Sequence, residues 1–209
     1  MKIFLLVFLS FLLSCKNQSR NEFKVISFDW SRDYFKDIAK GFNPISDNNW
    51  AFLKYGLNNG QAEVLYQKGE ILQNNESLVY DRGFYYQGHS IEWYYYIVSI
   101  ENDSLIYITD KNKLLKFLGD IDTMEEAFLL TILSGFIIDS NNPKGGSYSK
   151  TDEGYDFLLI KRDISSSIVD LNSIEYRQYL VNVDIKGNVK SEAREIYCRG
   201  YEECEGLKN

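Results

Sequence analysis

The segment from Ile91 to Ile138 constrains the fold more than any other part of the chain. Residues 91–100 form a β-branched and aromatic run, and residues 104–109 resume the same composition after Glu101-Asn102-Asp103. β-Branched and aromatic residues favour strands, and Asn and Asp favour tight turns between them. The segment therefore begins with a predicted antiparallel hairpin.

Two short helices are expected directly after this hairpin, at residues 111–118 and 124–134, and a glycine follows each of them. Glycine is a common residue at the end of a helix. Thr123 and Glu126 have the spacing of a capping box, in which the hydroxyl and the carboxylate each accept a hydrogen bond from a free backbone N–H. This spacing marks the start of the second helix.

Shorter patterns predict the other elements. Capping residues and apolar spacing favour a helix at residues 31–40 and a second short helix that is capped by Ser46-Asp47 and carries Trp50, Leu53 and Leu57. Residues 61–72 fit either two short strands around a turn or a helix over 61–67. The stretch 139–147 is rich in turn residues, and we expect a mobile loop there. Strand-like composition or alternation is found at residues 23–30, 155–162, 175–184 and 189–197, the last two joined by a turn at Gly187.

These elements predict one α+β domain over residues 23–209. The chain of 209 residues is 44% hydrophobic, which is enough for one well-buried core. No domain-sized repeat and no linker rich in Pro, Gly or Ser divides this region. We expect an antiparallel sheet of five or more strands, with the helices near residues 31–40, 111–118 and 124–134 packed on one face.

The first fifteen residues carry an export pattern. Lys2 precedes an eleven-residue apolar run, Ile3 to Leu13, that is broken only by Ser10. A membrane-spanning helix needs about 20 residues, so this run fits the core of a signal peptide. The run ends in Leu12-Leu13-Ser14-Cys15, which resembles the lipobox of bacterial lipoproteins. An ordinary secretory signal with an incidental cysteine is the alternative.

The resemblance to lipoproteins implies where the protein is located and how it is attached to a membrane. Residues 1–14 would be a signal peptide that is cleaved off, and the Cys15 thiol would carry a diacylglycerol group. Residues 15–22 would form a lipidated tether that holds the domain to a membrane. Residues 16–18, Lys-Asn-Gln, lack the aspartate that retains lipoproteins at the inner membrane and the acidic run that promotes surface display in Bacteroidota. The resemblance therefore points to the outer membrane, facing the periplasm.

Charge argues against one class of partner. Loss of residues 1–14 would leave 22 Lys and Arg residues against 30 Asp and Glu, a formal charge of −8. An acidic chain without a cluster of Lys and Arg repels phosphate backbones. We therefore expect no nucleic-acid partner.

Cys198 and Cys204 lie close to the end of the chain. In an oxidising compartment such a pair predicts a disulfide. A metal site is the alternative, but no histidine lies nearby and the spacing is not one that zinc sites use.

The most unusual segment is Tyr80 to Ser90. Flat aromatic rings and polar side chains together are typical of a surface that binds a sugar, a peptide or a protein. In the alternative interpretation, the aromatic residues only complete the core at an irregular edge, next to Trp93 and Tyr95, which are expected to be buried. The candidate contact residues are Asp81, Arg82, Tyr85, Tyr86 and His89.

No catalytic motif is recognisable. His89 is the one histidine in the chain, and no serine lies in a nucleophile elbow that would complete a triad. Paired carboxylates would be needed for glycoside hydrolysis, and four acidic residues lie close together: Asp120, Asp122, Glu125 and Glu126. Their position at the start of a helix is also explained by capping alone. No cofactor and no metal ion is expected.

These observations together favour a membrane-anchored, non-enzymatic envelope lipoprotein that binds a partner protein or ligand. An immunity protein or inhibitor is a special case, because an acidic domain attracts a basic toxin. The alternative is a carbohydrate-active enzyme or sugar-binding lipoprotein that uses the carboxylates and the aromatic residues of segment 80–96.

Replacement of the proposed acyl acceptor tests the anchor directly. Cys15→Ser should abolish incorporation of labelled fatty acid, because serine offers no thiol for acylation, and should release the chain from membranes or leave the uncleaved precursor. Fractionation and fatty-acid labelling measure this. A mutant that is labelled as strongly as the wild type would rule out Cys15 as the acceptor.

Overall fold

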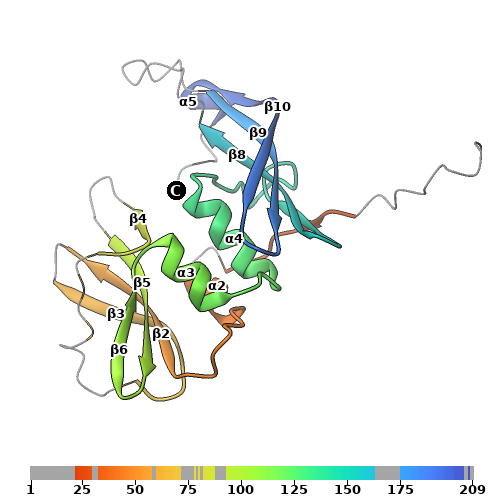
Figure 1. The fold of residues 1–209 in the computed structure, drawn as a ribbon. Coiled ribbons are helices and arrows are strands. Elements are labelled where there is room, and N and C mark those ends of the chain that lie inside the picture. Colours follow the sequence, from red (N-terminus) through yellow and green to blue (C-terminus); the bar gives the residue numbers. More distant parts are fainter. Residues whose placement is uncertain are drawn as a thin grey trace, which may run out of the picture.

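The structure is a computed structural model of the chain (Figure 1). It describes residues 22–29, 33–57, 60–71, 78, 80, 82–87, 93–162, 175–204 and 207. Its strands are β1 (Lys24–Val25), β2 (Trp50–Gly56), β3 (Gln61–Lys68), β4 (Tyr85–Gln87), β5 (Trp93–Glu101), β6 (Ser104–Ile108), β7 (Ser147–Thr151), β8 (Gly154–Arg162), β9 (Glu175–Asp184) and β10 (Val189–Arg199). Its helices are α2 (Phe35–Lys40), α3 (Lys111–Leu118), α4 (Met124–Leu133) and α5 (Gly200–Glu203).

The strands form two antiparallel sheets. Sheet A has the order β1-β7-β8-β9-β10, and sheet B has the order β3-β2-β5-β4 with β6 also paired to β5. β4 and β6 share one edge of β5, opposite Trp93–Tyr95 and Ile97–Glu101 respectively. The expected α+β class with antiparallel pairing is confirmed, and the strands are divided between two sheets where the sequence analysis described one.

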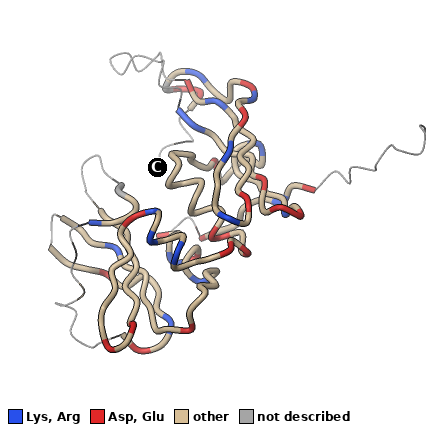
Figure 2. The backbone as a smooth tube through the Cα atoms, viewed as in Figure 1, with Lys and Arg blue, Asp and Glu red and all other residues tan. Residues whose placement is uncertain are grey.

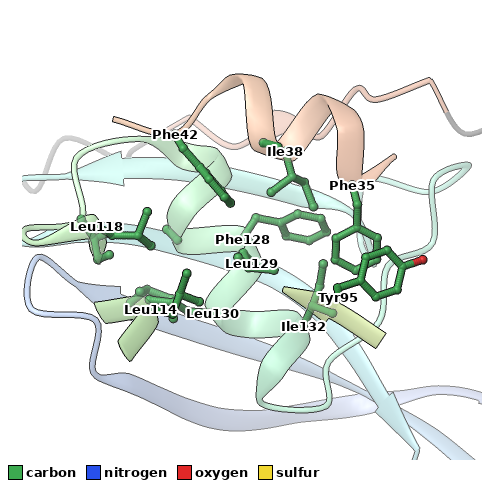
Figure 3. Close-up of a cluster of buried hydrophobic side chains, with 14 of the residues drawn as sticks. Phe35, Ile38, Phe42, Tyr95, Leu114, Leu118, Phe128, Leu129, Leu130 and Ile132 are labelled. Atoms are coloured by element: carbon green, nitrogen blue, oxygen red, sulfur yellow. The ribbon is translucent and has the colours of Figure 1, made fainter. Parts of the chain in front are cut away.

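Helices lie between the two sheets (Figure 1). Helices α2 and α3 contact sheet B, α4 contacts sheet A, and α2 contacts α4. One cluster of buried side chains extends through these layers, from Tyr95 of sheet B to Phe157 of sheet A. Figure 3 shows Phe35 beside Tyr95, with Phe128 and Ile132 of α4 close to them.

The two predicted helices after the first hairpin are confirmed. Helix α3 has the expected bounds, and the Asp110 side chain accepts a hydrogen bond from the Lys113 N–H at its start. Helix α4 begins with the predicted capping box between Thr123 and Glu126 and ends one residue earlier than expected. The capping residues that specify these helices are close together in the chain. This explains why the sequence predicts both helices correctly.

The predicted short helix after Ser46-Asp47 is wrong, because Trp50–Gly56 is strand β2. Trp50 and Phe52 belong to the main core, whereas Ala51 and Leu53 belong to a second cluster on the opposite face of sheet B. A strand buried on both faces loses the alternation of apolar and polar residues. The helix alternative for residues 61–67 is also wrong, since β3 pairs with β2 over Gln61–Lys68.

The second cluster explains why two neighbouring tyrosines of β5 are both buried. Tyr95 is 2% exposed and faces the helices, and Tyr96 is 0% exposed on the other face. The Tyr96 hydroxyl donates to the Leu78 carbonyl at 2.7 Å. Trp93, expected inside, is only half-buried. The N-terminal helix, expected from residue 31, begins at Phe35, and Ser31, its expected cap, lies outside the described residues.

The loop at 139–147 is held in place, contrary to the expectation of mobility. The Tyr197 hydroxyl donates to the Asp139 carboxylate at 2.6 Å, and the Gln178 side chain donates to the Lys144 carbonyl at 2.5 Å. Within the loop, the Asp139 N–H donates to the Gly145 carbonyl at 2.9 Å. These partners come from β9 and β10, at least 34 residues away in the chain. No pattern within the loop itself could therefore predict them.

The C-terminal hairpin and the disulfide agree with the sequence analysis. β9 pairs with β10, and Gly187 in their turn has a φ of +77°, which glycine adopts without strain. The Cys198 and Cys204 sulfur atoms are 2.08 Å apart, and both residues are buried. The bridge joins the end of β10 to the residue after α5.

Glu126 is the most deeply buried charged group among the described residues, at 0% exposure. Its carboxylate accepts from the backbone N–H groups of Asn43 at 2.7 Å, Asp122 at 3.2 Å and Thr123 at 3.3 Å. Burial raises the pKa of Glu126, although the three N–H donors act in the opposite direction. The side chain therefore ties the loop before β2 to the start of α4.

Glu126→Ala should lower the free energy of unfolding by about 2–4 kcal/mol, because it leaves three partly buried N–H donors without their acceptor and empties a fully buried position. Urea unfolding measures the loss. Glu125→Ala in the same helical turn is the matched control and should cost less than about 1 kcal/mol. Equal losses for the two variants would contradict the structural role assigned to Glu126.

Candidate binding surface

The structure describes only part of the predicted contact segment. Asp81 and His89 lie outside the described residues, and Tyr86 is part of β4 with a side chain that is not described. Arg82 is exposed and Tyr85 is half-buried. Cys15 also lies outside the described residues, so its role stays a prediction.

Strand β4 places Tyr85 directly beside β5. Tyr85 lies opposite Tyr95, and the Phe84 N–H donates to the Tyr95 carbonyl at 3.0 Å. A Cβ atom on Gly83 would lie 2.2 Å from the same carbonyl oxygen. Only glycine permits this close approach of the two backbones. The glycine before the aromatic residues is thus required by the position of β4.

Aromatic rings from three elements gather around Tyr85. Its ring centroid lies 5.4 Å from that of Phe35 and 5.8 Å from that of Tyr95. Tyr34 stacks on Phe35 at 4.8 Å, and Phe35 stacks on Tyr95 at 4.2 Å. We call Tyr34, Phe35, Tyr85 and Tyr95 the tyrosine cluster. Such separations are typical of favourable ring pairs.

An ion pair borders the tyrosine cluster. The Lys54 ammonium lies 2.8 Å from the Asp33 carboxylate, and the two side chains are 17% and 21% exposed. The Tyr95 hydroxyl donates to the same carboxylate at 3.3 Å. Lys54 also lies over the Trp93 ring, 4.3 Å from its centroid, a cation–π geometry. Polar and aromatic groups therefore meet at one end of sheet B.

The phenols of the cluster hold their protons firmly. Burial raises the pKa of Tyr34 and of Tyr95 far above the ordinary tyrosine value, and the nearby Asp33 carboxylate raises both further. Burial also raises the pKa of Tyr85. At neutral pH these hydroxyls are protonated, as an ordinary tyrosine hydroxyl is, and they can donate hydrogen bonds.

The sequence analysis did not find Asp33, Lys54 or Tyr34 as members of this site. Asp33 was expected to belong to the first turn of a helix, and Lys54 was placed on a helix that is in fact β2. Asp33 and Lys54 are 21 residues apart in the chain. The aromatic composition around Tyr85 was the signal that pointed to this region.

The acidic residues considered for glycoside hydrolysis have structural partners. Glu126 accepts three backbone hydrogen bonds, as described above. Asp120 pairs with Lys186 at 2.5 Å, and the Asp122 carboxylate accepts from the Asn43 side chain at 2.8 Å. Glu125 lies beside Gly41. Glu126 takes part in the capping box of α4, whereas the carboxylates of Asp120 and Asp122 contact the side chains of Lys186 and Asn43.

Among the residues that the structure describes, no group of three or more His, Cys, Asp and Glu residues is arranged to hold a metal ion. None of the described helices is long and apolar enough to cross a membrane. Figure 2 shows acidic and basic residues interspersed along both sheets.

The chain was compared with protein-family models, with curated proteins and with solved structures, and none of the three comparisons found a match.

A double-mutant cycle on Asp33→Asn and Lys54→Met should give a coupling energy of about 1–2 kcal/mol, because both charges are largely shielded from water. Urea unfolding of the wild type, both single variants and the double variant measures it. The matched control is the exposed pair of Asp47 and Lys68, whose side chains are 106% and 46% exposed. Its coupling should be too small to measure, because water and salt screen an exposed ion pair. Similar couplings for both pairs would contradict a shielded site.

Proposed function

We propose that this protein is an envelope lipoprotein, anchored through acylated Cys15, whose domain binds a partner protein or ligand without catalysing a reaction. The observation that carries the binding role is the half-buried Tyr85 close to the exposed Arg82, with the Tyr85 ring packed on the buried rings of Phe35 and Tyr95. The resemblance of residues 12–15 to a lipobox supports the anchor. The outer membrane, on its periplasmic side, is the proposed location.

The contact surface is proposed to include Arg82 and Tyr85. Arg82 is exposed, and the half-buried Tyr85 ring packs against the rings of Phe35 and Tyr95. Arginine and tyrosine are enriched among the residues that dominate protein interfaces. A rigid aromatic side chain loses little conformational entropy when a partner binds it. These properties support recognition at this edge of sheet B.

One observation favours binding over catalysis. The carboxylates of Asp120 and Glu126 have structural partners, which speaks against the alternative of a carbohydrate-active enzyme built on that group. Sugar binding at the aromatic segment would use the same surface. An immunity protein or inhibitor is the special case that the acidic charge favours.

Arg82→Ala should weaken capture of the physiological partner about tenfold without changing the thermal transition, because an exposed arginine contributes to contact rather than to packing. The measurement is a quantitative pull-down of the detergent-extracted lipoprotein, with co-purified proteins counted by mass spectrometry. Arg194→Ala on β10, also exposed, is the matched control.

The comparison between the two arginine variants decides the result. Equal recovery of every co-purified protein with Arg82→Ala and Arg194→Ala would contradict a contact surface at Arg82. A glycan array probed with the same proteins distinguishes a sugar ligand from a protein partner. Tyr85→Phe, which keeps the ring and removes the hydroxyl, reports separately on the phenol.

A further inference from the structure

Sheet A carries apolar side chains on the face that points away from the helices. Lys24 lies opposite Tyr148, and the Tyr148 ring packs on the core residue Phe157 at 6.3 Å. Successive residues of a strand point to opposite faces. Val25 and its partner Ser147 therefore face outward, on the far side of sheet A from the helices.

The outward residues follow one another in register across the sheet. Val25 lies opposite Ser147, Ser147 opposite Leu158, and Leu158 opposite Leu180, and the exposed Glu192 of β10 comes next. Ser147, between Val25 and Leu158, is only 1% exposed. Val25 is 52% exposed and Phe23, two residues earlier, is 36% exposed; Leu158 and Leu180 are half-buried. We call Phe23, Val25, Leu158 and Leu180 the outer apolar row. Grouped apolar exposure of this kind marks an interaction surface.

The proposed anchor places this row next to a bilayer. Six residues separate Cys15 from Glu22, and even a fully extended chain of that length spans only about 25 Å. The apolar row begins at the next residue, Phe23. This step depends on the proposed acylation of Cys15.

Charge near the anchor also fits a membrane surface. Residues 16–25 contain Lys16, Arg20 and Lys24 against the single acid Glu22, although the chain as a whole has a formal charge of −7. Basic residues close to an anionic leaflet are attracted to it. The segment next to the proposed anchor therefore has a net positive charge although the whole chain is acidic.

We propose that the outer apolar row docks on the phospholipid leaflet that holds the lipid anchor. Exposed apolar residues next to basic ones enter the interfacial region of a bilayer, and a lipid chain on the same segment keeps them close to it. β1 lies on the side of the molecule away from sheet B (Figure 1). Docking through sheet A therefore leaves Arg82 and Tyr85 free to meet a partner in solution.

A fluorescent probe at residue 25 tests this docking in the full-length acylated protein. Val25→Cys is labelled with the polarity-sensitive dye NBD; acylation blocks Cys15, and the disulfide blocks Cys198 and Cys204. The labelled protein is placed in vesicles of phosphatidylethanolamine and phosphatidylglycerol. The emission maximum of the dye should lie at a shorter wavelength in vesicles than in aqueous buffer without detergent. Nitroxide-labelled lipids in the vesicles should quench the fluorescence.

Val64→Cys on β3 is the matched control, since Val64 is 37% exposed at the edge of sheet B. Its dye should show neither the shift nor the quenching. Equal behaviour of the two positions would overturn the docking. A blue shift at residue 25 that resists lipid quenching and grows with protein concentration would assign the row to a second copy of the chain, and would overturn it too.

Two further measurements separate the possible failures. The intact mass reports the acyl chains, so a mass without them overturns the anchor and, with it, the docking, whereas acylated protein with a solvent-exposed residue 25 overturns the docking alone. Hydrogen exchange of the unlabelled wild-type protein tests the docking without the cysteine variant, so the test does not depend on whether that variant folds. For each segment, the exchange rate in vesicles is compared with the rate in detergent micelles. The decrease in vesicles should be larger for the amides of Ser147 to Thr151 than for those of Gln61 to Lys68.

Discussion

The structure depends on the burial of α4 between the two sheets. Every residue from Glu126 to Ile132 is buried, so this helix has no polar face that could be left in water. A helix that is apolar all round requires cover on all sides. Sheet A supplies it on one side, and α2, which lies between α4 and sheet B, supplies it on another. Glu126 is the one charged residue in this buried stretch, and its three backbone donors tie the loop before β2 to α4.

The same layered arrangement creates the tyrosine cluster. Because α2 lies between sheet B and α4, Phe35 meets Tyr95 and Tyr85 from the helix side. The second apolar cluster covers the opposite face of sheet B, which leaves the ends of its strands as the places where polar groups reach the aromatic rings. Asp33, Lys54 and Trp93 meet at such an end. The candidate site therefore lies at the strand ends of sheet B, where its cover by other layers stops.

Local signals in the sequence identified several elements correctly. The turns at residues 101–103 and at Gly187, the caps of α3 and α4, and the bridge between Cys198 and Cys204 all involve residues that are close in the chain. Longer-range features escaped prediction. β2 looks helical because both of its faces are buried, and the loop at 139–147 looks mobile because Gln178 and Tyr197, which hold it, come much later.

By itself, the sequence determined the α+β class, both long hairpins, two of the helices and the disulfide, because turn chemistry, capping and short loop closure operate between near neighbours. Its lipobox stays a prediction that concerns residues outside the described structure. Only the tertiary structure decided the division into two sheets, the partners of Asp33 and Lys54, and the outward row on sheet A. Those features depend on which faces are buried, and burial is set by contacts between residues that are far apart in the chain.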